Sequence, residues 1–146
     1  MKGTHAAVEA YDATRELKLR SRDAIIHFDE GLVGFSDCKD FVLMENESLS
    51  PFRLLQSLES PQVGFLVLDP TMLVNNYYDQ VPQREWVSLG VTGTTKPLAF
   101  VIVVIGTTPE MSTGNFQAPL LINYEKMIGK QVILTDAEYS VRHPLV

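Results

Sequence analysis

The chain has 146 residues and 45% of them are hydrophobic, which predicts one folded domain rather than a disordered segment. Its longest apolar run, residues 98–105, has eight residues, whereas a membrane helix needs about 20, so we expect no membrane partner. The net charge of −6 disfavours contact with phosphate, and the single cysteine, Cys38, excludes an internal disulfide and favours a cytoplasmic location.

The N-terminal part of the chain is predicted to contain a leader and a first strand. Residues 1–13 show no hydrophobic periodicity, so we interpret them as a mobile leader to a single domain over residues 14–146. In residues 17–22 apolar or small side chains alternate with three basic ones, as in a half-exposed strand. No aromatic side chains interleave with this basic row, so we favour a solvated or edge-protecting role over nucleic-acid binding.

The middle of the chain is predicted to contain four strands and one helix. Apolar runs bounded by turn residues predict strands at residues 24–28, 41–45, 52–57 and 63–68, the last two forming a hairpin. Gly31 and Gly34 allow tight bends after the first of these strands. Residues 82–89 are predicted to form a short helix, because Pro82 suits its first turn and Gly90 its end.

The last third of the chain is predicted to contribute further strands. Residues 98–105 form a β-branched run typical of a fully buried central strand. Pro119 removes a backbone donor, so a strand is expected to begin there, giving a hairpin of residues 120–124 and 131–134. Residues 136–146 form a tail with room for one short strand. Regularly spaced strands without β-α-β alternation predict an all-β, mainly antiparallel fold: a small closed or nearly closed β-barrel-like domain, or a sandwich, with one or two short helices.

The sequence gives no support for catalysis or for a bound cofactor or metal. The three histidines, His5, His27 and His143, are far apart and lack metal-ligand spacing. We expect His27 to be exposed or hydrogen-bonded to a neighbour, and His143 to be structural. No nucleophile elbow, phosphate-binding loop or dinucleotide fingerprint is present. We therefore expect a binding protein rather than an enzyme.

Charge and aromatic residues give the candidates for a binding surface. Residues 29–90 hold ten acidic against three basic residues, including Glu45 and Glu47 in a turn. This acidic region is either an ordinary solubilising surface, which we favour, or a surface that attracts a basic protein. Adjacent exposed tyrosines beside a carboxylate, Tyr77, Tyr78 and Asp79, would offer a large contact area. The other interpretation is that one tyrosine caps the core.

Two asparagines near Pro119 are further candidates, although a structural role is favoured for both. Asn115 and Asn123 lie beside or at the end of a predicted strand, where asparagine bonds its own backbone and specifies turns. A binding role for either residue is the less favoured alternative.

Motifs in both halves of the chain resemble one protein family. In the N-terminal half they are Phe28-x-x-Gly31-Leu32-x-Gly34-Phe35, Phe41-Val42-Leu43, Ser50-Pro51-Phe52-x-x-Leu55-Gln56-Ser57 and Pro61-x-x-x-Phe65-x-Val67. In the C-terminal half they are Thr113-x-Asn115-x-x-Ala118-Pro119-x-x-Ile122-Asn123, Gly129-Lys130-Gln131 and Tyr139-x-x-Arg142-His143-Pro144-Leu145. In order and spacing, over residues 25–145, these motifs resemble the flagellar assembly factor FliW family.

The resemblance implies a compact β-barrel-like domain with two protein partners. Members of this family bind the C-terminal region of flagellin and, in many bacteria, the RNA-binding translational repressor CsrA. Export of flagellin frees the assembly factor, which then sequesters CsrA so that flagellin synthesis resumes. Where many relatives carry a Pro-Asp-Tyr-Glu-like run, this chain has residues 75–78 as Asn-Asn-Tyr-Tyr, with the acidic residue at Asp79. A β-barrel that binds a small ligand in its mouth, or a purely structural barrel, is the alternative.

Overall fold

The computed structural model describes residues 24–135 and 137–146, so the predicted leader and the predicted strand at 17–22 lie outside the described residues. The strands in chain order are β1 (Ala24–Phe28), β2 (Asp40–Met44), β3 (Arg53–Ser57), β4 (Gly64–Leu68), β5 (Leu98–Val104), β6 (Thr113–Gly114), β7 (Leu120–Asn123), β8 (Ile128–Gln131) and β9 (His143–Pro144). The described ranges also contain the α-helix α2 (Gln83–Ser88) and the 3-10 helices η1 (Glu47–Leu49), η2 (Pro70–Met72), η3 (Tyr77–Gln80) and η4 (Pro109–Met111). No helix in the described ranges has the length and apolar character to cross a membrane.

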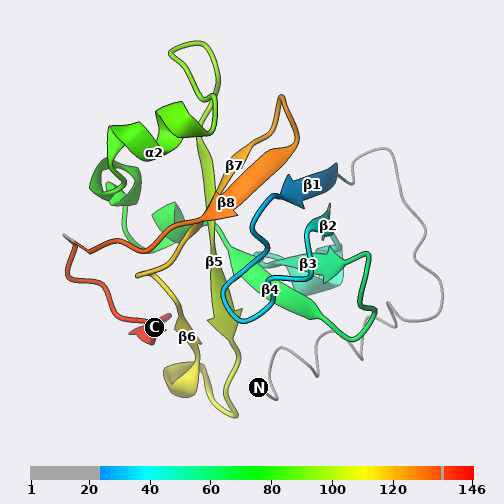
Figure 1. Ribbon diagram of the computed structural model, residues 1–146. Coiled ribbons are helices and arrows are strands. Elements are labelled where there is room, and N and C mark those ends of the chain that lie inside the picture. The colour runs from blue at the N-terminus through cyan, green and yellow to red at the C-terminus, as the bar shows by residue number, and fades with distance from the viewer. Residues whose placement is uncertain (1–23, 136) are drawn as a thin grey trace.

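The strands form a closed barrel with a short extension (Figure 1). The hydrogen-bonded order is β4-β3-β2-β1-β8-β7-β5-β6-β9, and a further pairing between β4 and β5 closes the first seven strands into a ring. Between these described strands, all pairings are antiparallel except that of β1 with β8, where His27 lies opposite Ile128 and Phe28 opposite Gly129. The predicted all-β, mainly antiparallel barrel is confirmed, and the one parallel pair makes the sheet mixed.

Strand β5 closes the barrel because it is long enough to meet three neighbours. Its first half pairs with β7, where Phe100 lies opposite Leu120. Its second half pairs with β4 along one edge, with Val101 opposite Leu68, and with β6 along the other, with Val104 opposite Thr113. The predicted central strand is thus confirmed in place, but the prediction that it is fully buried is wrong, because Leu98, Ile102 and Val104 are only half-buried.

The barrel interior is filled by side chains. Phe28 and Phe41 meet edge to face there, with their ring centroids 5.6 Å apart. The ring of Phe28 also lies over Gly129, where any added Cβ would come within 2.7 Å of it. The buried apolar residues of the interior are Ala24, Ile26, Phe28, Leu32, Cys38, Phe41, Leu43, Leu55, Phe65, Val67, Phe100, Leu120 and Ile122. The interior therefore holds a packed core.

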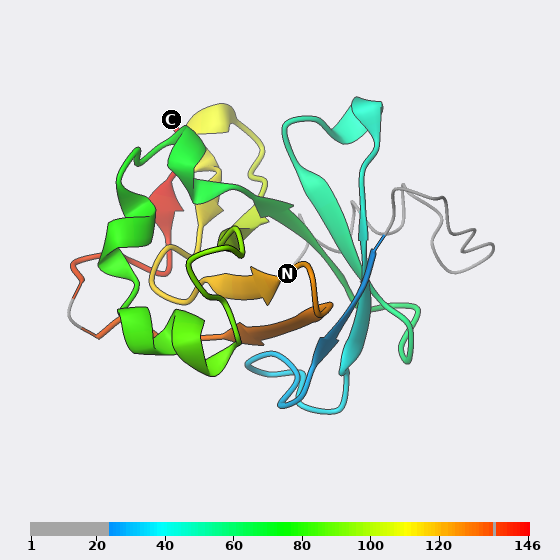
Figure 2. The ribbon, with the colours of Figure 1, turned by 90° about the horizontal axis from the view of Figure 1, so that it is seen from above.

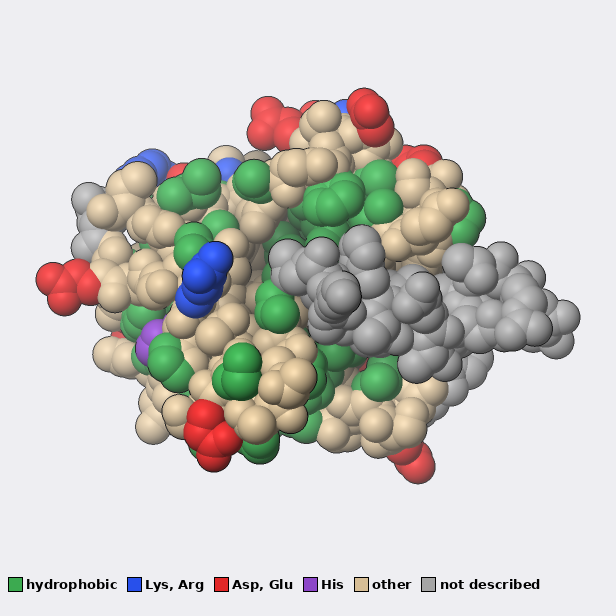
Figure 3. Space-filling view, turned by 90° about the horizontal axis from the view of Figure 1, so that it is seen from below, with side chains coloured by type: hydrophobic (Ala, Val, Ile, Leu, Met, Phe, Trp, Pro, Cys, Tyr) green, Lys and Arg blue, Asp and Glu red, His purple; other side chains and the backbone are tan. Residues whose placement is uncertain are grey.

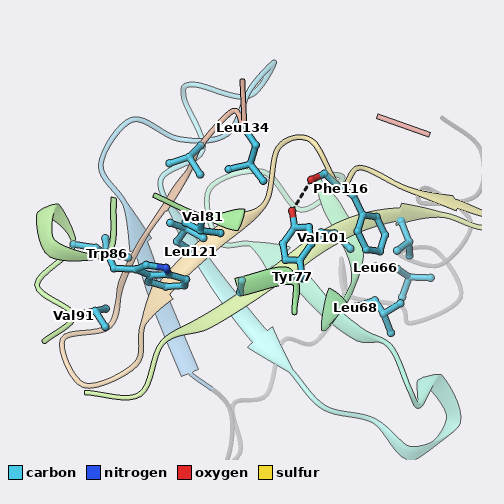
Figure 4. Close-up of a cluster of buried hydrophobic side chains, with 14 residues drawn as sticks. Leu66, Leu68, Tyr77, Val81, Trp86, Val91, Val101, Phe116, Leu121 and Leu134 are labelled. Carbon is cyan, nitrogen blue, oxygen red and sulfur yellow. Dashed lines mark hydrogen bonds between the residues drawn. The ribbon is translucent and has the colours of Figure 1, made fainter. Parts of the chain in front are cut away.

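A second core lies outside the barrel, between its β4-β5-β7 face and the short helices. Figure 2 shows the helices η2, η3 and α2 gathered on one side of the barrel. Figure 4 shows the side chains packed beneath them, including Tyr77, Trp86 and Phe116. Alternate residues of β5, among them Val101 and Val103, point into this core. Strand β5 is thus covered on its outer face as well as by the barrel interior.

The predicted element bounds hold within about one residue for the middle strands and the helix, but not for the last hairpin. Its second strand is β8, three residues earlier than the predicted span of 131–134. The side chain of Asn123 accepts hydrogen bonds from the next turn, and Met127 adopts a left-handed conformation with φ of 55°, so the chain reverses sooner. Beyond β8 the pairing continues irregularly, since the Val132 N–H donates to the Pro119 carbonyl.

Candidate functional site

An apolar groove of about 580 Å³ lies where β5 emerges from the barrel, between the loop after β1 and the C-terminal segment. We call it the β5 groove. Its lining residues are Val33, Phe35, Phe65, Ile102, Val104, Met111, Thr113, Asn115, Gln131, Val141 and Arg142. Seen from below, the molecule shows hydrophobic side chains over its central part and acidic side chains at its margins (Figure 3).

The floor of the β5 groove continues the barrel interior. Phe65 is part of the buried interior core, and Ile102 packs against it. Because side chains alternate along a strand, Ile102 and Val104 point away from the outer core that holds Val101 and Val103. Ile102 and Val104 are half-buried, so the groove is the open mouth of the barrel rather than a sealed cavity.

One wall of the groove is a short loop to which the side chain of Gln131 is hydrogen-bonded. Gly31 and Gly34 have φ of 66° and 85°, so the loop turns through conformations that favour glycine. The Gln131 side chain accepts a hydrogen bond from the Val33 N–H at 2.8 Å and donates one to the Ala118 carbonyl at 3.0 Å. Val33 is thereby fixed with 68% of its surface exposed.

The opposite wall comes from η4, β6 and the C-terminal segment. Met111 is 61% exposed and Val141 is also exposed. The Arg142 N–H donates to the Ser140 hydroxyl at 2.9 Å, which fixes the backbone that carries this charged lining residue. Thr113 and Asn115 complete this wall with uncharged polar groups.

The prediction that Tyr77 and Tyr78 are both exposed is wrong. Tyr77 is fully buried, and its hydroxyl donates to the Phe116 carbonyl at 2.5 Å (Figure 4). Tyr78 is half-buried, and its hydroxyl accepts a hydrogen bond from the Ala99 N–H at 2.7 Å. Burial raises the pKa of Tyr77, and it raises the pKa of Tyr78 to about 12. The alternative interpretation, a tyrosine that caps the core, describes Tyr77, which presents no surface to a partner.

The acidic candidates lie on two separate parts of the surface. Asp79 is exposed in η3, on the helix-covered side. Glu45 and Glu47 are exposed around η1 and line a hollow of about 340 Å³, where Arg53 lies 3.5 Å from the Glu45 carboxylate. Figure 2 shows η1 and the helices around α2 on opposite sides of the barrel. A role for these three carboxylates in partner binding stays a prediction.

The two asparagines differ in exposure. Asn123 is buried, and its amide donates to the Leu89 carbonyl at 3.0 Å while its oxygen accepts from two N–H groups of the following turn. Asn115 is half-buried in the groove wall, and its side-chain oxygen accepts from the Ala118 N–H at 3.1 Å. Both asparagines therefore stabilise backbone, and of the two only Asn115 lines the groove.

Two histidines and the cysteine interact with neighbouring residues of the fold. His27 bonds Asp40 at 2.8 Å, which matches the prediction of a hydrogen-bonded neighbour. This hydrogen bond raises the pKa of His27. The ring of His143 lies 4.4 Å from that of Phe116 between centroids, and Cys38 is buried. In the described residues, no group of three or more His, Cys, Asp and Glu is placed to hold a metal ion.

The sequence reasoning missed most of the β5 groove. Val33, Met111 and Val141 stand out only once the fold brings their three segments together. The apolar run of residues 98–105 gave no separate signal, because alternate burial of its last residues follows only from the fold.

Comparison with known proteins identifies the family. The model of the family described as FliW protein matches residues 12–145. The chain belongs to the FliW family. It is 39% identical over 127 residues to the flagellar assembly factor FliW of Leptospira interrogans serogroup Icterohaemorrhagiae serovar Lai (strain 56601), covering 86% of this chain and 85% of that protein. It is 34% identical over 129 residues to the flagellar assembly factor FliW of Natranaerobius thermophilus, covering 86% and 83%.

The fold agrees with this membership. A crystal structure of the flagellar assembly factor FliW superposes with a TM-score of 0.77 at 33% sequence identity, covering 88% of this chain and 89% of that chain. The resemblance carried by the sequence motifs is thereby confirmed. The family is one of flagellar assembly factors, and the barrel described above is its fold.

Proposed function

We propose that this protein binds the C-terminal region of flagellin in the cytoplasm and, when free, sequesters the translational repressor CsrA. The observation that carries this proposal is membership of the FliW family over residues 12–145. The protein would act by binding alone, coupling the amount of unexported flagellin to the activity of the repressor. For such a switch, each partner must lower the affinity of the protein for the other, by direct competition or by coupling between two sites.

The surface has the two properties that these partners require. Terminal segments of flagellin are helical and amphipathic, and they suit an apolar groove such as the one at the barrel mouth. CsrA binds RNA and is expected to present basic groups, which suit the acidic region of residues 29–90. An acidic surface docked beside the RNA site of CsrA would also repel RNA phosphates.

The alternative of a small-ligand barrel is disfavoured by the packing. Among the described residues, thirteen buried apolar side chains fill the interior, four of them phenylalanines, so within the barrel a ligand has room only in the open mouth. A ligand pocket usually encloses most of the ligand surface, whereas the β5 groove is shallow enough to leave Val33 and Met111 more than half exposed.

Size-exclusion chromatography of purified proteins tests the proposal. The protein is mixed with flagellin and with CsrA from the same bacterium in separate runs, and we expect it to comigrate with each. Flagellin lacking its C-terminal region is the control and should elute alone. Adding intact flagellin to the complex with CsrA should release CsrA. Failure to comigrate with either partner would overturn the proposal.

A further inference from the structure

We propose that the β5 groove is the docking site for one amphipathic α-helix from the C-terminal region of flagellin, with Arg142 paired to a carboxylate on that helix. The inference rests on the proposed function for the identity of the partner. The site itself follows from the shape, backbone pairing and charge of the groove.

The apolar surface of the groove defines which side of the partner it contacts. Val33, Met111 and Val141 are all more than half exposed, and they surround a floor formed by Ile102 and Val104. Exposed apolar side chains gathered around one hollow mark an interaction site on a soluble domain. A groove with two walls and an apolar floor accommodates a cylinder with apolar side chains along one side, which is the shape of an amphipathic helix.

The backbone of the groove explains why the partner segment is a helix rather than a strand. At the floor, β5 is paired with β4 along one edge and with β6 along the other, and the Ile102 carbonyl accepts from the Asn115 N–H at 2.8 Å. The outermost strand beside the groove, β9, has two residues, of which Pro144 lacks a backbone donor. An added strand would find little to pair with, whereas a helix satisfies its own backbone groups.

Charge adds one directed contact between the groove and the helix. Among the described residues that line the groove, Arg142 is the charged one, in a protein with net charge −6. Within the described residues, no carboxylate lies at ion-pair distance from Arg142. Arg142 is exposed, so a helix with an acidic residue at the border of its apolar face could reach it and form a charge-assisted hydrogen bond.

The loop wall is arranged before the partner arrives. Gln131 bonds both the Val33 N–H and the Ala118 carbonyl, and Leu32 and Phe35 bond each other across the bend. A groove whose walls are already fixed loses little conformational entropy on binding. The position of Val33 is thus set by contacts that lie outside the apolar surface itself.

Substitution of exposed groove residues, with matched controls on the helix-covered side, tests the site. Val33→Asp and Met111→Asp are compared with Val87→Asp and Met72→Asp, whose native side chains are 62% and 57% exposed away from the groove. Isothermal calorimetry with purified flagellin from the same bacterium should show at least a tenfold loss of affinity for each groove variant. The two controls should bind as the wild type does. Equal binding by groove variants and wild type would overturn the site and leave the proposed function standing.

Arg142 is tested separately by its charge. Arg142→Glu should weaken flagellin binding severalfold more than Arg142→Lys, and the difference should shrink at 1 M salt, where screening is strong. A loss that is equal for both substitutions would overturn the pairing. If the wild-type protein itself fails to bind flagellin, the proposed function fails and the groove assignment falls with it.

A cross-linking experiment, in which binding gives a positive signal, complements the substitutions that lower affinity. A bifunctional thiol–amine cross-linker attached at Val33→Cys should capture flagellin, and the same reagent at Val87→Cys should not. The native Cys38 is buried, so labelling is directed to the introduced thiol. Capture at Val87→Cys but not at Val33→Cys would place flagellin on the other side of the barrel and overturn the proposal.

Discussion

The two faces of strand β5 carry the same kinds of side chain, but one face is buried under the short helices and the other is partly open. Val101 and Val103 are buried beneath η3 and α2, in the core that also holds Tyr77 and Phe116. Ile102, one residue along, belongs to the face that runs from the barrel interior to the open β5 groove. The apolar run itself is therefore not what distinguishes a core face from a binding surface. Whether a face is core or binding surface depends on the segments that cover it, and these segments are far away in the sequence.

The largest difference in stability between the two faces is expected when a large side chain of the outer core is truncated. Phe116 is fully buried and packs edge to face on Tyr77 with centroids 5.5 Å apart, so Phe116→Ala should lower the free energy of unfolding by about 3–5 kcal/mol. Phe35→Ala, on the half-buried groove wall, should cost clearly less. Urea denaturation measures both. Equal losses would mean that the barrel mouth is packed as tightly as the outer core.

A smaller effect is expected from removing the support of the groove wall. Gln131→Ala deletes the two hydrogen bonds that join the loop of Val33 to Ala118, and it should cost about 1 kcal/mol of stability. Because the wall then moves more freely, affinity for flagellin should fall as well. Gln62→Ala, at an exposed position outside the groove, is the control for both measurements. Unchanged hydrogen exchange at the Val33 amide would contradict the role given to Gln131.

Local patterns in the sequence were sufficient for the strands of the middle region and for the helix. Residues 24–28 match β1 as predicted, and residues 82–89 contain α2. These elements are specified by periodicity, turn glycines and a proline at the helix start, all within a few residues. The early turn before β8 was missed because Met127, and not Gly129, takes the left-handed conformation.

The candidate site could not be predicted in the same way. Tyr77 was expected on the surface because polar residues surround it in sequence, yet its hydroxyl finds the Phe116 carbonyl 39 residues away. The parallel pair of β1 and β8 likewise joins segments about a hundred residues apart, and it brings the loop of Val33 to Gln131. The groove is a product of these long-range contacts. Its residues carry no local pattern that marks them as a site.

Tyr77 and Tyr78 are expected to make the protein less stable at alkaline pH. Burial raises the pKa of both Tyr77 and Tyr78, so the folded state favours the neutral hydroxyls. Their contribution is complete below the unfolded value of 10.0 and is lost as pH rises through the folded value, about 12 for Tyr78. The free energy of unfolding should therefore fall between pH 10 and 12. Tyr78→Phe should reduce this slope, whereas Tyr124→Phe, at an exposed tyrosine, should leave it unchanged.

The smallest effect on the fold, and the clearest separation of the two partners, is expected at the acidic turn. Glu45→Lys combined with Glu47→Lys removes the ion pair of Glu45 with Arg53, which as an exposed pair contributes about 0–1 kcal/mol, so the fold should persist. Binding of CsrA should weaken strongly at low salt and little at high salt, because the attraction between exposed charges is screened. Binding of flagellin at the β5 groove should be unchanged, since that contact is mainly apolar.

The matched control for the acidic turn is the pair Glu125→Lys and Glu138→Lys, which makes the same change of net charge outside residues 29–90. If the electrostatic attraction of CsrA depends on the acidic region, this control retains more CsrA binding than the variant at the turn. An equal loss would show that only total charge matters, and a loss that does not depend on salt would exclude electrostatic attraction as its cause. A loss of flagellin binding in the turn variant alone would instead place both partners on one surface. The switch would then work by direct competition rather than by coupling between two faces of the barrel.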